Sequence, residues 1–163
     1  MPYGLDRTEA SDNEETLDLE LEGFSPDPPD KAGIGQLLFQ LFPDSSGVNI
    51  DNLSDYIIAN NTIGTVVKNH TEDGSAEEDD DDIVFALTTV VDLSPQQCKR
   101  WIAGSQIKNF AKKIINNCSN SNFADNKVEL NEILSDSGSI RPYLLINERL
   151  TPLPPKVCSS SLT

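Results

Sequence analysis

The stretch IGTVVKNHTEDGSAEEDDDDIVFALTTVVDL, residues 63–93, decides the fold of this chain. Its two ends, Ile63 to Val67 and Ile83 to Leu93, are rich in the β-branched and apolar residues that favour strands. Between them residues 72–82 carry eight carboxylates, which repel one another and favour a solvated loop. The pattern therefore predicts two strands joined by a long acidic loop, in the manner of a wide hairpin.

A further strand is predicted upstream of this hairpin. From Thr16 onward Leu17, Leu19 and Leu21 alternate with acidic residues, and this period of two is typical of a half-buried strand. The carboxylates on its polar face indicate a strand at an edge or at the surface. The prolines within residues 25–30 end the strand, because proline cannot donate a hydrogen bond to the ladder.

Three short helices are predicted from the spacing of apolar residues. The first covers about 31–42, with Asp30 as its N-cap, and Pro43 ends it. The second covers about 51–59. The third, about 128–135, follows a polar linker at 119–126.

A longer helix follows the second strand of the hairpin. Ser94, Pro95 and Gln97 match a capping box with proline at the first helical position, and the apolar stripe predicts one helix that runs to about Asn117. Tyr143 to Ile146 is the last predicted strand. The chain therefore belongs to the mixed α and β class.

The charge of the chain is strongly negative and unevenly distributed. The net charge is −15, ten of the 27 acidic residues fall in residues 1–30, and the apolar fraction is only 37%. We expect residues 1–15 to be a disordered acidic tail. Such a chain repels nucleic acid and anionic membranes, because binding either requires clustered Lys and Arg. Its natural partners are basic proteins.

Several features predict an intracellular location. The first 25 residues contain no apolar run, so no secretory signal is expected, and the apolar run from Ile83 to Leu87 is too short to span a bilayer. Cys98, Cys118 and Cys158 form an odd set with no CxxC spacing. On one helix, Cys98 and Cys118 would lie about 30 Å apart and could not form a disulfide. These cysteines favour a reducing compartment.

Residues that could carry catalysis or bind a metal are scarce. His70 is the only histidine, and the scattered cysteines give no zinc-ligand spacing. Gly33 and Gly35 begin like a dinucleotide-binding fingerprint, but Leu38 stands where the third glycine belongs, so a loose first helical turn is the better interpretation. The acidic loop lacks the spaced calcium-binding pattern. We expect no enzyme activity, no cofactor and no metal.

Two sets of charged residues are candidates for partner binding. The first is the acidic run Glu77, Glu78, Asp79, Asp80, Asp81 and Asp82, as a docking site for a basic partner. The second is the basic set Lys99, Arg100, Lys108, Lys112 and Lys113, which lies in a stretch without acids. A solvated helix face explains the basic set most simply. Contact with the acidic loop or with an acidic partner is the alternative.

Two serines lie in contexts that acidophilic kinases favour. Ser11 and Ser75 are each followed, three residues later, by an acidic residue.

The order of these elements resembles the BCCIP family over about residues 31–157. The matching segments include QLLFQLF at 36–42, IGTVVK followed by the acidic insertion, VFALTTVVDL at 84–93, and LLINERL followed by LPP near the end. A BCCIP-like domain is therefore predicted over 16–157, with the acidic loop 72–82 as an insertion and 158–163 as an unstructured tail.

The resemblance implies a fold and a function that the residue patterns alone do not. Its fold is similar to the acetyltransferases (GNAT-like), with a central mixed sheet flanked by helices. Its members are non-enzymatic nuclear adaptors and chaperones that shield a basic large-subunit ribosomal protein, which links them to ribosome biogenesis. Animal members bind a recombination-repair protein and an inhibitor of cyclin-dependent kinases, and connect to DNA repair, the cell cycle and microtubule organisation. We expect a nuclear protein, with the cytoplasm or the spindle pole as further locations.

The chain departs from the family pattern at its C-terminal end. Family members continue well beyond the LPP motif, whereas this sequence stops eight residues after Pro155. We therefore expect an acetyltransferase-like half that is incomplete at the C-terminus, with Ile83 to Leu93 or Tyr143 to Ile146 left at the edge of the sheet. Two other functions stay open: a generic acidic histone-type chaperone, and an acetyltransferase. The second lacks the required glycine-rich loop, because no glycine follows Leu93 before Gly104.

Overall fold

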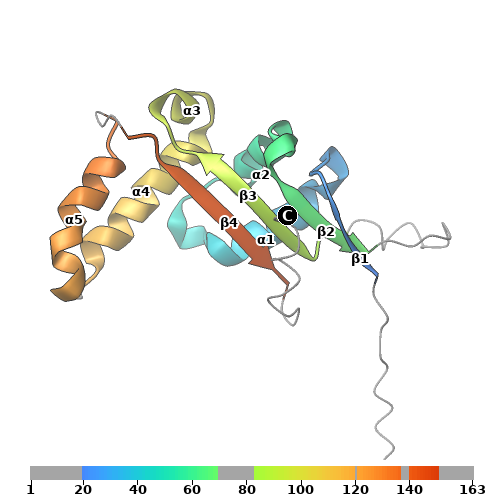
Figure 1. Ribbon diagram of the computed structural model, residues 1–163, viewed down its shortest axis with the longest axis horizontal. Helices are drawn as coiled ribbons and strands as arrows, with labels where there is room; N and C mark the ends of the chain where they lie inside the picture. The colour runs from blue at the N-terminus through green and yellow to red at the C-terminus, as the bar shows by residue number, and fades with distance from the viewer. Residues whose placement is uncertain (1–19, 70–82, 120, 137–139, 151–163) are drawn as a thin grey trace, which may run out of the picture.

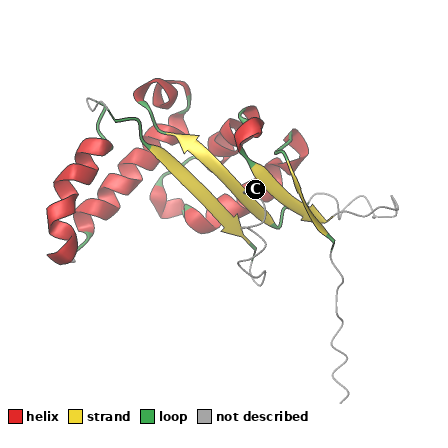
Figure 2. Ribbon diagram, viewed as in Figure 1, coloured by secondary structure: helices red, strands yellow, loops and turns green. Residues whose placement is uncertain are grey.

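The computed structural model describes residues 20–69, 83–119, 121–136 and 140–150. In these ranges the chain forms one sheet whose strands follow the order β1 (Leu21–Phe24), β2 (Thr65–Asn69), β3 (Ala86–Asp92) and β4 (Tyr143–Arg149), with every neighbouring pair antiparallel (Figure 1). In these ranges two α-helices lie between β1 and β2 along the chain and three lie between β3 and β4, and helices cover the rear face of the sheet in the view of Figure 2. The predicted mixture of α and β elements is confirmed.

The β2–β3 hairpin confirms the prediction made from residues 63–93. Thr65 pairs with Thr88, and the N–H of Phe85 donates to the carbonyl of Val67 at 2.8 Å. The β-branched residues of both strands favour this extended pairing. Ile63 lies outside the strand, in a short 3-10 turn, and its side chain is 59% exposed.

The helix-covered face of the sheet carries the main core. Helix α1 (Lys31–Leu41) and helix α2 (Ile50–Ala59) lie against each other, and α1 also contacts β3 and β4. Each fully buried aliphatic side chain stabilises the fold by roughly 1.5–3 kcal/mol relative to an exposed one. The side chains in this core that are less than 2% exposed are Ile34, Leu37, Leu38, Leu53, Ile57, Val66, Leu87, Val91 and Ile146.

The ends of α1 and of α2 were each predicted to within one residue. The hydrogen bonds of the Asp30 side chain at the start of α1 were not predicted. Asp30 has helical backbone angles and makes no side-chain cap hydrogen bond. Its carboxylate, 1% exposed, instead accepts from the N–H of Asp27 and from the ammonium of Lys68, each at 2.9 Å. Asp30 therefore occupies the predicted N-cap position of α1, but its side chain does not cap the helix, because an ion pair with Lys68, 38 residues away, takes the carboxylate. This pair ties β2 to the start of α1.

The prediction of one long helix from Ser94 to Asn117 is wrong. It is two helices, α3 (Pro95–Arg100) and α4 (Ile102–Asn117), separated at Trp101, whose backbone is extended. The break lets the indole ring pack edge-on against Tyr56 at 5.5 Å. It also brings Gly104 against Cys98, where an added Cβ would lie 3.0 Å from the sulfur. Ser94 makes no side-chain cap bond, and its buried hydroxyl has no partner among the described residues.

Helix α5 (Ser121–Ile133) begins earlier than predicted, so the expected linker at 119–126 is mostly helical. It packs against α4, and the two helices extend to one side of the sheet (Figure 1). Cys118 follows α4 and Cys98 lies in α3, and both are free cysteines. None of the helices in the described ranges has the length and apolar character needed to cross a membrane.

Strand β4 is three residues longer than predicted and forms one edge of the described sheet, with β3 as its neighbour. Of the two strands expected at an edge, the final one is therefore the correct choice, since β3 has neighbours on both sides. β1 forms the other edge, as predicted for the strand that includes Leu21. Residues 16–19, which carry most of the alternating pattern, lie outside the described residues. An acetyltransferase-like arrangement and an incomplete C-terminus stay predictions. The predicted tails 1–15 and 158–163 lie outside the described residues.

Candidate functional site

The predicted acidic docking site, Glu77 to Asp82, lies outside the described residues. The strands that flank it are described, however. The insertion leaves from the end of β2 and returns at the start of β3, and the hairpin ends away from α5 in Figure 1.

The charge of the described part is nearly balanced. It contains ten Lys and Arg residues and thirteen Asp and Glu residues, a net charge of −3 out of the total of −15. The remaining 49 residues, all outside the described ranges, therefore carry most of the negative charge. Long-range attraction of a basic protein depends on this net charge, so it comes mainly from the acidic sequences attached to the folded part.

The basic set predicted on one solvated helix face is split by the structure. Lys99, Arg100 and Lys113 are exposed, and Lys112 is partly buried. Lys108 is only 4% exposed, so its place on a solvated face was predicted wrongly. The reason is that α4 packs against both α3 and α5, and Lys108 lies on the packed side, within reach of Asp136 after α5.

Lys108 belongs instead to a small polar cluster beneath α3. Its ammonium donates to Asp136 at 2.7 Å, and this hydrogen bond lowers the pKa of the Asp136 carboxyl. Burial raises the pKa of the neighbouring Cys98 thiol, whose sulfur contacts the Leu93 carbonyl at 3.4 Å. A buried thiol with a raised pKa is a poor nucleophile. The cluster therefore serves packing between α3, α4 and the end of α5.

A second polar cluster joins β3, β4 and α2. The guanidinium of Arg141 donates to Asp92 and stacks over the Tyr143 ring at 5.6 Å. Burial alone would raise the pKa of Asp92, but the hydrogen bonds from Arg141 and Ser94 outweigh it, so this pKa is lowered. The hydroxyl of Tyr56 accepts from the Asp92 N–H at 3.1 Å. This arrangement fixes the strand ends and leaves no open nucleophile.

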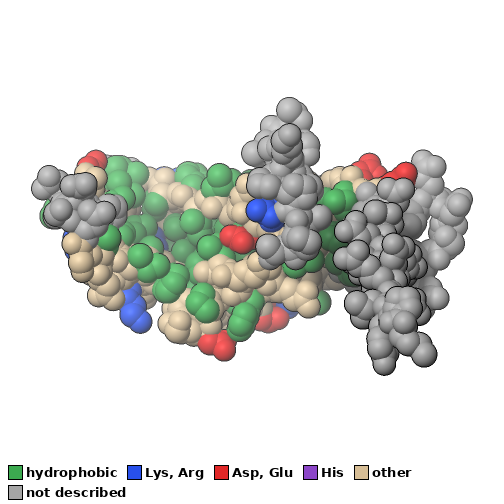
Figure 3. Space-filling view, turned by 90° about the horizontal axis from the view of Figure 1, so that it is seen from below, with side chains coloured by type: hydrophobic (Ala, Val, Ile, Leu, Met, Phe, Trp, Pro, Cys, Tyr) green, Lys and Arg blue, Asp and Glu red, His purple; other side chains and the backbone are tan. Residues whose placement is uncertain are grey.

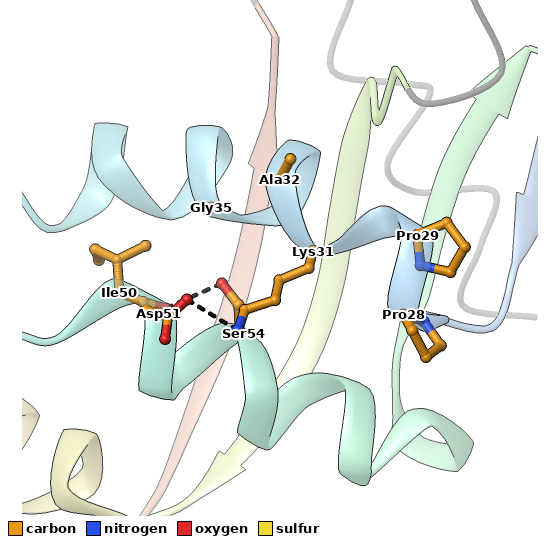
Figure 4. A pocket seen from close by; sticks show the side chains of 8 residues that line it. All are labelled: Pro28, Pro29, Lys31, Ala32, Gly35, Ile50, Asp51 and Ser54. Carbon is orange, nitrogen blue, oxygen red and sulfur yellow. Dashed lines mark hydrogen bonds and ion pairs between the residues drawn. The ribbon is translucent and has the colours of Figure 1, made fainter. Parts of the chain in front are cut away.

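A cleft lies between α1 and α2, and sequence reasoning missed it. Its volume is about 560 Å³, and its apolar lining comes from Pro28, Pro29, Ala32, Ile50 and the backbone of Gly35 (Figure 4). The polar lining residues are Lys31, Asp51 and Ser54. We call this feature the α1–α2 cleft.

A lysine ammonium sits between two carboxylates at the rim of the α1–α2 cleft. The Lys31 nitrogen lies 2.9 Å from Asp51 and 2.7 Å from Asp55, and these hydrogen bonds raise the pKa of Lys31, with Asp51 the larger cause. Asp51 and Asp55 are four residues apart, so both project from one face of α2. That spacing is visible in the sequence and could have revealed the pair. The partner Lys31 comes from another helix and could not.

The face of β4 that points away from α1 is partly open. Tyr143 and Leu145 are 55% and 60% exposed, whereas Ile146 between the helices and the sheet is fully buried. Seen from below, the described surface carries hydrophobic side chains in several patches, with isolated charged side chains between them (Figure 3). The edge and this face offer apolar contact area, with Asn147 exposed on the same face of the strand.

Catalytic and metal-binding constellations do not emerge in the described ranges. They contain no group of three or more His, Cys, Asp or Glu side chains placed to hold a metal ion. His70 lies outside these ranges. Gly33, from the rejected dinucleotide pattern, lies inside α1, where an added Cβ would stand 2.7 Å from Val84. Gly33 therefore lies in a first helical turn, as the simpler interpretation predicted, but this turn is closely packed on Val84 and not loose.

Comparison with known proteins places these features in context. The profile of the BCCIP family matches residues 16–163. The chain is 29% identical over 152 residues to a protein of Arabidopsis thaliana named Protein BCCIP homolog, which covers 93% of this chain and 41% of that protein. A Drosophila melanogaster protein of the same name is 31% identical over 149 residues, with 88% of this chain and 48% of that protein covered.

A human relative is named for its partners. The Homo sapiens protein called BRCA2 and CDKN1A-interacting protein is 30% identical over 148 residues, with 88% of this chain and 44% of the human protein covered. The chain thus spans somewhat less than half the length of each of these relatives.

Proposed function

Because this chain belongs to the BCCIP family, we propose that it is a non-enzymatic nuclear adaptor and chaperone that shields a basic large-subunit ribosomal protein. The observation that carries this proposal is the distribution of charge. A folded part of net charge −3 carries acidic sequences that bring the total to −15. Dispersed carboxylates neutralise Lys- and Arg-rich surfaces that would otherwise bind nucleic acid nonspecifically.

The same chain is proposed to contact proteins of recombination repair and of cell-cycle control. The support is the name of the human relative, BRCA2 and CDKN1A-interacting protein. An adaptor of this kind needs separate surfaces for separate partners. The α1–α2 cleft and the open face of β4 are two such surfaces on the described part.

The alternative hypothesis that this chain is an acetyltransferase is the enzymatic function that we reject. Such an enzyme holds a pyrophosphate on the backbone N–H groups of a glycine-rich loop between a strand and a helix. Here β3 leads through Ser94 into α3, which begins with Pro95 and therefore lacks one N–H at this position. We propose that the chain does not bind acetyl-coenzyme A. Calorimetry with the cofactor is expected to give no heat of binding, and a micromolar dissociation constant would restore the enzyme reading.

A generic histone-type chaperone is the second candidate, since acidity alone attracts any basic protein. A competition experiment separates the two. The full chain is bound to the labelled ribosomal protein near physiological salt, and mixed histones are added as competitor. We expect the ribosomal protein to remain bound at equimolar histone. Complete displacement by equimolar histone would favour the generic chaperone.

A further inference from the structure

We propose that the α1–α2 cleft is a docking site for a lysine- or arginine-bearing segment of a basic protein. The cationic group of this segment lies against the exposed outer oxygen of Asp51, beside the Lys31 ammonium, and its aliphatic stem lies on Ala32 and Ile50. This inference rests on the proposed function, because it assumes a basic partner. It assigns part of the binding to the folded surface, whereas the sequence assigned it to the acidic insertion.

The first argument is that the two carboxylates already hold a cation. The ammonium of Lys31 is bracketed by Asp51 and Asp55 at 2.9 and 2.7 Å, from a helix different from theirs. One positive charge faces two negative charges, so the group keeps a net charge of −1. Asp51 is 77% exposed along its side chain and offers its outer oxygen to solvent or to a second cation.

The second argument is the shape and chemistry of the cleft beside these carboxylates. Its walls are mainly apolar, and its volume of about 560 Å³ accommodates a long side chain together with part of a backbone. Lysine and arginine carry an aliphatic stem that packs on apolar surface while the charged end stays at the rim. A simple inorganic cation would make no use of these walls, whereas a basic peptide segment uses both.

The third argument is that the cleft is open at its floor. An added Cβ at Gly35 would lie 3.8 Å from Ile50 and 3.9 Å from Ser54, which is ordinary van der Waals contact. A side chain can therefore start at this position, and the further atoms of a larger one would occupy part of the cleft that Gly35 lines. Gly35→Leu blocks the site while leaving the charges unchanged, and it favours the helix, since glycine is a poor helix former.

The variants give effects of opposite sign. Asp51→Asn with Asp55→Asn removes both carboxylates and is expected to weaken binding of a short arginine-rich peptide about tenfold, since each exposed ion pair changes a binding constant by up to roughly fivefold. Lys31→Met keeps the aliphatic stem and removes the internal competitor, so it is expected to tighten binding. Glu129→Gln with Glu132→Gln, both exposed on α5, is the matched control for the change in net charge.

The test is a nuclear magnetic resonance titration of the full chain with the arginine-rich peptide and with a glutamine counterpart. Circular dichroism establishes that each variant is folded. We expect backbone shifts at Ala32, Gly35 and Asp51, with the dissociation constant raised by the double Asn variant and by Gly35→Leu, and lowered by Lys31→Met.

Two outcomes overturn the inference in different ways. Binding that leaves the cleft resonances unmoved, or that the double Asn variant weakens no more than the α5 control, excludes the cleft and leaves the proposed basic partner in place. No binding of the arginine-rich peptide anywhere on the chain contradicts both the cleft and the proposed function.

Discussion

Two glycines of α1, only two residues apart, are expected to respond in opposite ways to the same substitution. An added Cβ at Gly33 would lie 2.7 and 2.8 Å from two side-chain carbons of Val84 and 3.1 Å from its backbone nitrogen. Real contacts are not this short, so Gly33→Ala forces the helix away from the residues that precede β3. At Gly35 the new methyl group meets only ordinary contacts at 3.8 Å or more.

The expected magnitudes follow from these distances. Overpacking a tight core contact costs about 1–3 kcal/mol, and replacing glycine by alanine in a helix returns up to about 1 kcal/mol. Gly33→Ala is therefore expected to lower the free energy of unfolding by about 1–2 kcal/mol. Gly35→Ala is expected to raise it by about 0.5–1 kcal/mol. Each variant adds one methyl group to α1, and the two positions are only two residues apart.

Urea unfolding followed by circular dichroism measures both values. A double-mutant cycle identifies the contact. Val84→Ala removes the Cγ2 methyl group, which is the nearest of the three obstructing atoms, and keeps Cβ and the backbone nitrogen. The combination with Gly33→Ala is therefore expected to be more stable than the sum of the two single effects by up to about 1 kcal/mol. If Gly33→Ala is as stable as Gly35→Ala, or if the cycle shows no coupling, the packing of α1 against the start of β3 is wrong.

Three further perturbations test other parts of the account. Lys68→Met is expected to lower the free energy of unfolding by about 2–4 kcal/mol, because the buried Asp30 carboxylate loses its cation; an unchanged urea midpoint would contradict this. Burial raises the pKa of Glu148, so its contribution to stability is present below the unfolded-state pKa and is lost as the pH rises through the folded-state pKa. Glu148→Gln is therefore expected to raise the melting temperature at pH 7 more than at pH 4, and an equal effect at both would exclude this linkage. Replacing Asp79 to Asp82 by asparagine is expected to slow association with a basic partner and to flatten its salt dependence, whereas an unchanged stopped-flow rate would make the insertion a solvated loop.

Local patterns predicted the elements whose formation depends on local interactions. The β-branched runs around the acidic insertion gave the β2–β3 hairpin, and the apolar spacing gave α1 and α2 almost to the residue. In each case the periodicity that marks the element also marks the face that it buries. The acids that alternate before Leu21 likewise indicated an edge strand.

The errors arose where a contact between distant residues overrides local preference. A strong helix start is present at Ser94, Pro95 and Gln97, yet the helix breaks at Trp101. The break allows the indole ring to pack edge-on against Tyr56, and this contact stabilises the fold more than a continuous helix would. Asp30 stands where an N-cap belongs, but Lys68 takes its carboxylate. Neither contact can be predicted from a short segment of sequence, because the two residues that make it lie far apart in the chain.

The candidate site shows the same division. The sequence located charge, as runs of acids or bases, but not the combination of charge with a cavity. Asp51 and Asp55 have the spacing of one helix face. The lysine between them comes from α1, and the apolar walls come from α1, from the prolines before it and from Ile50 of α2. Only the packing of α1 on α2 brings these groups together.

The central claim is that this acidic chain shields a basic ribosomal protein, and a solubility assay tests it most directly. The purified large-subunit ribosomal protein is mixed with RNA near physiological salt, with the full chain or with an unrelated protein of similar net charge, and the soluble fraction is measured by sedimentation. We predict that the chain keeps the ribosomal protein soluble in a stoichiometric complex and that the unrelated acidic protein does so much less effectively. Equal precipitation with and without the chain would contradict the account.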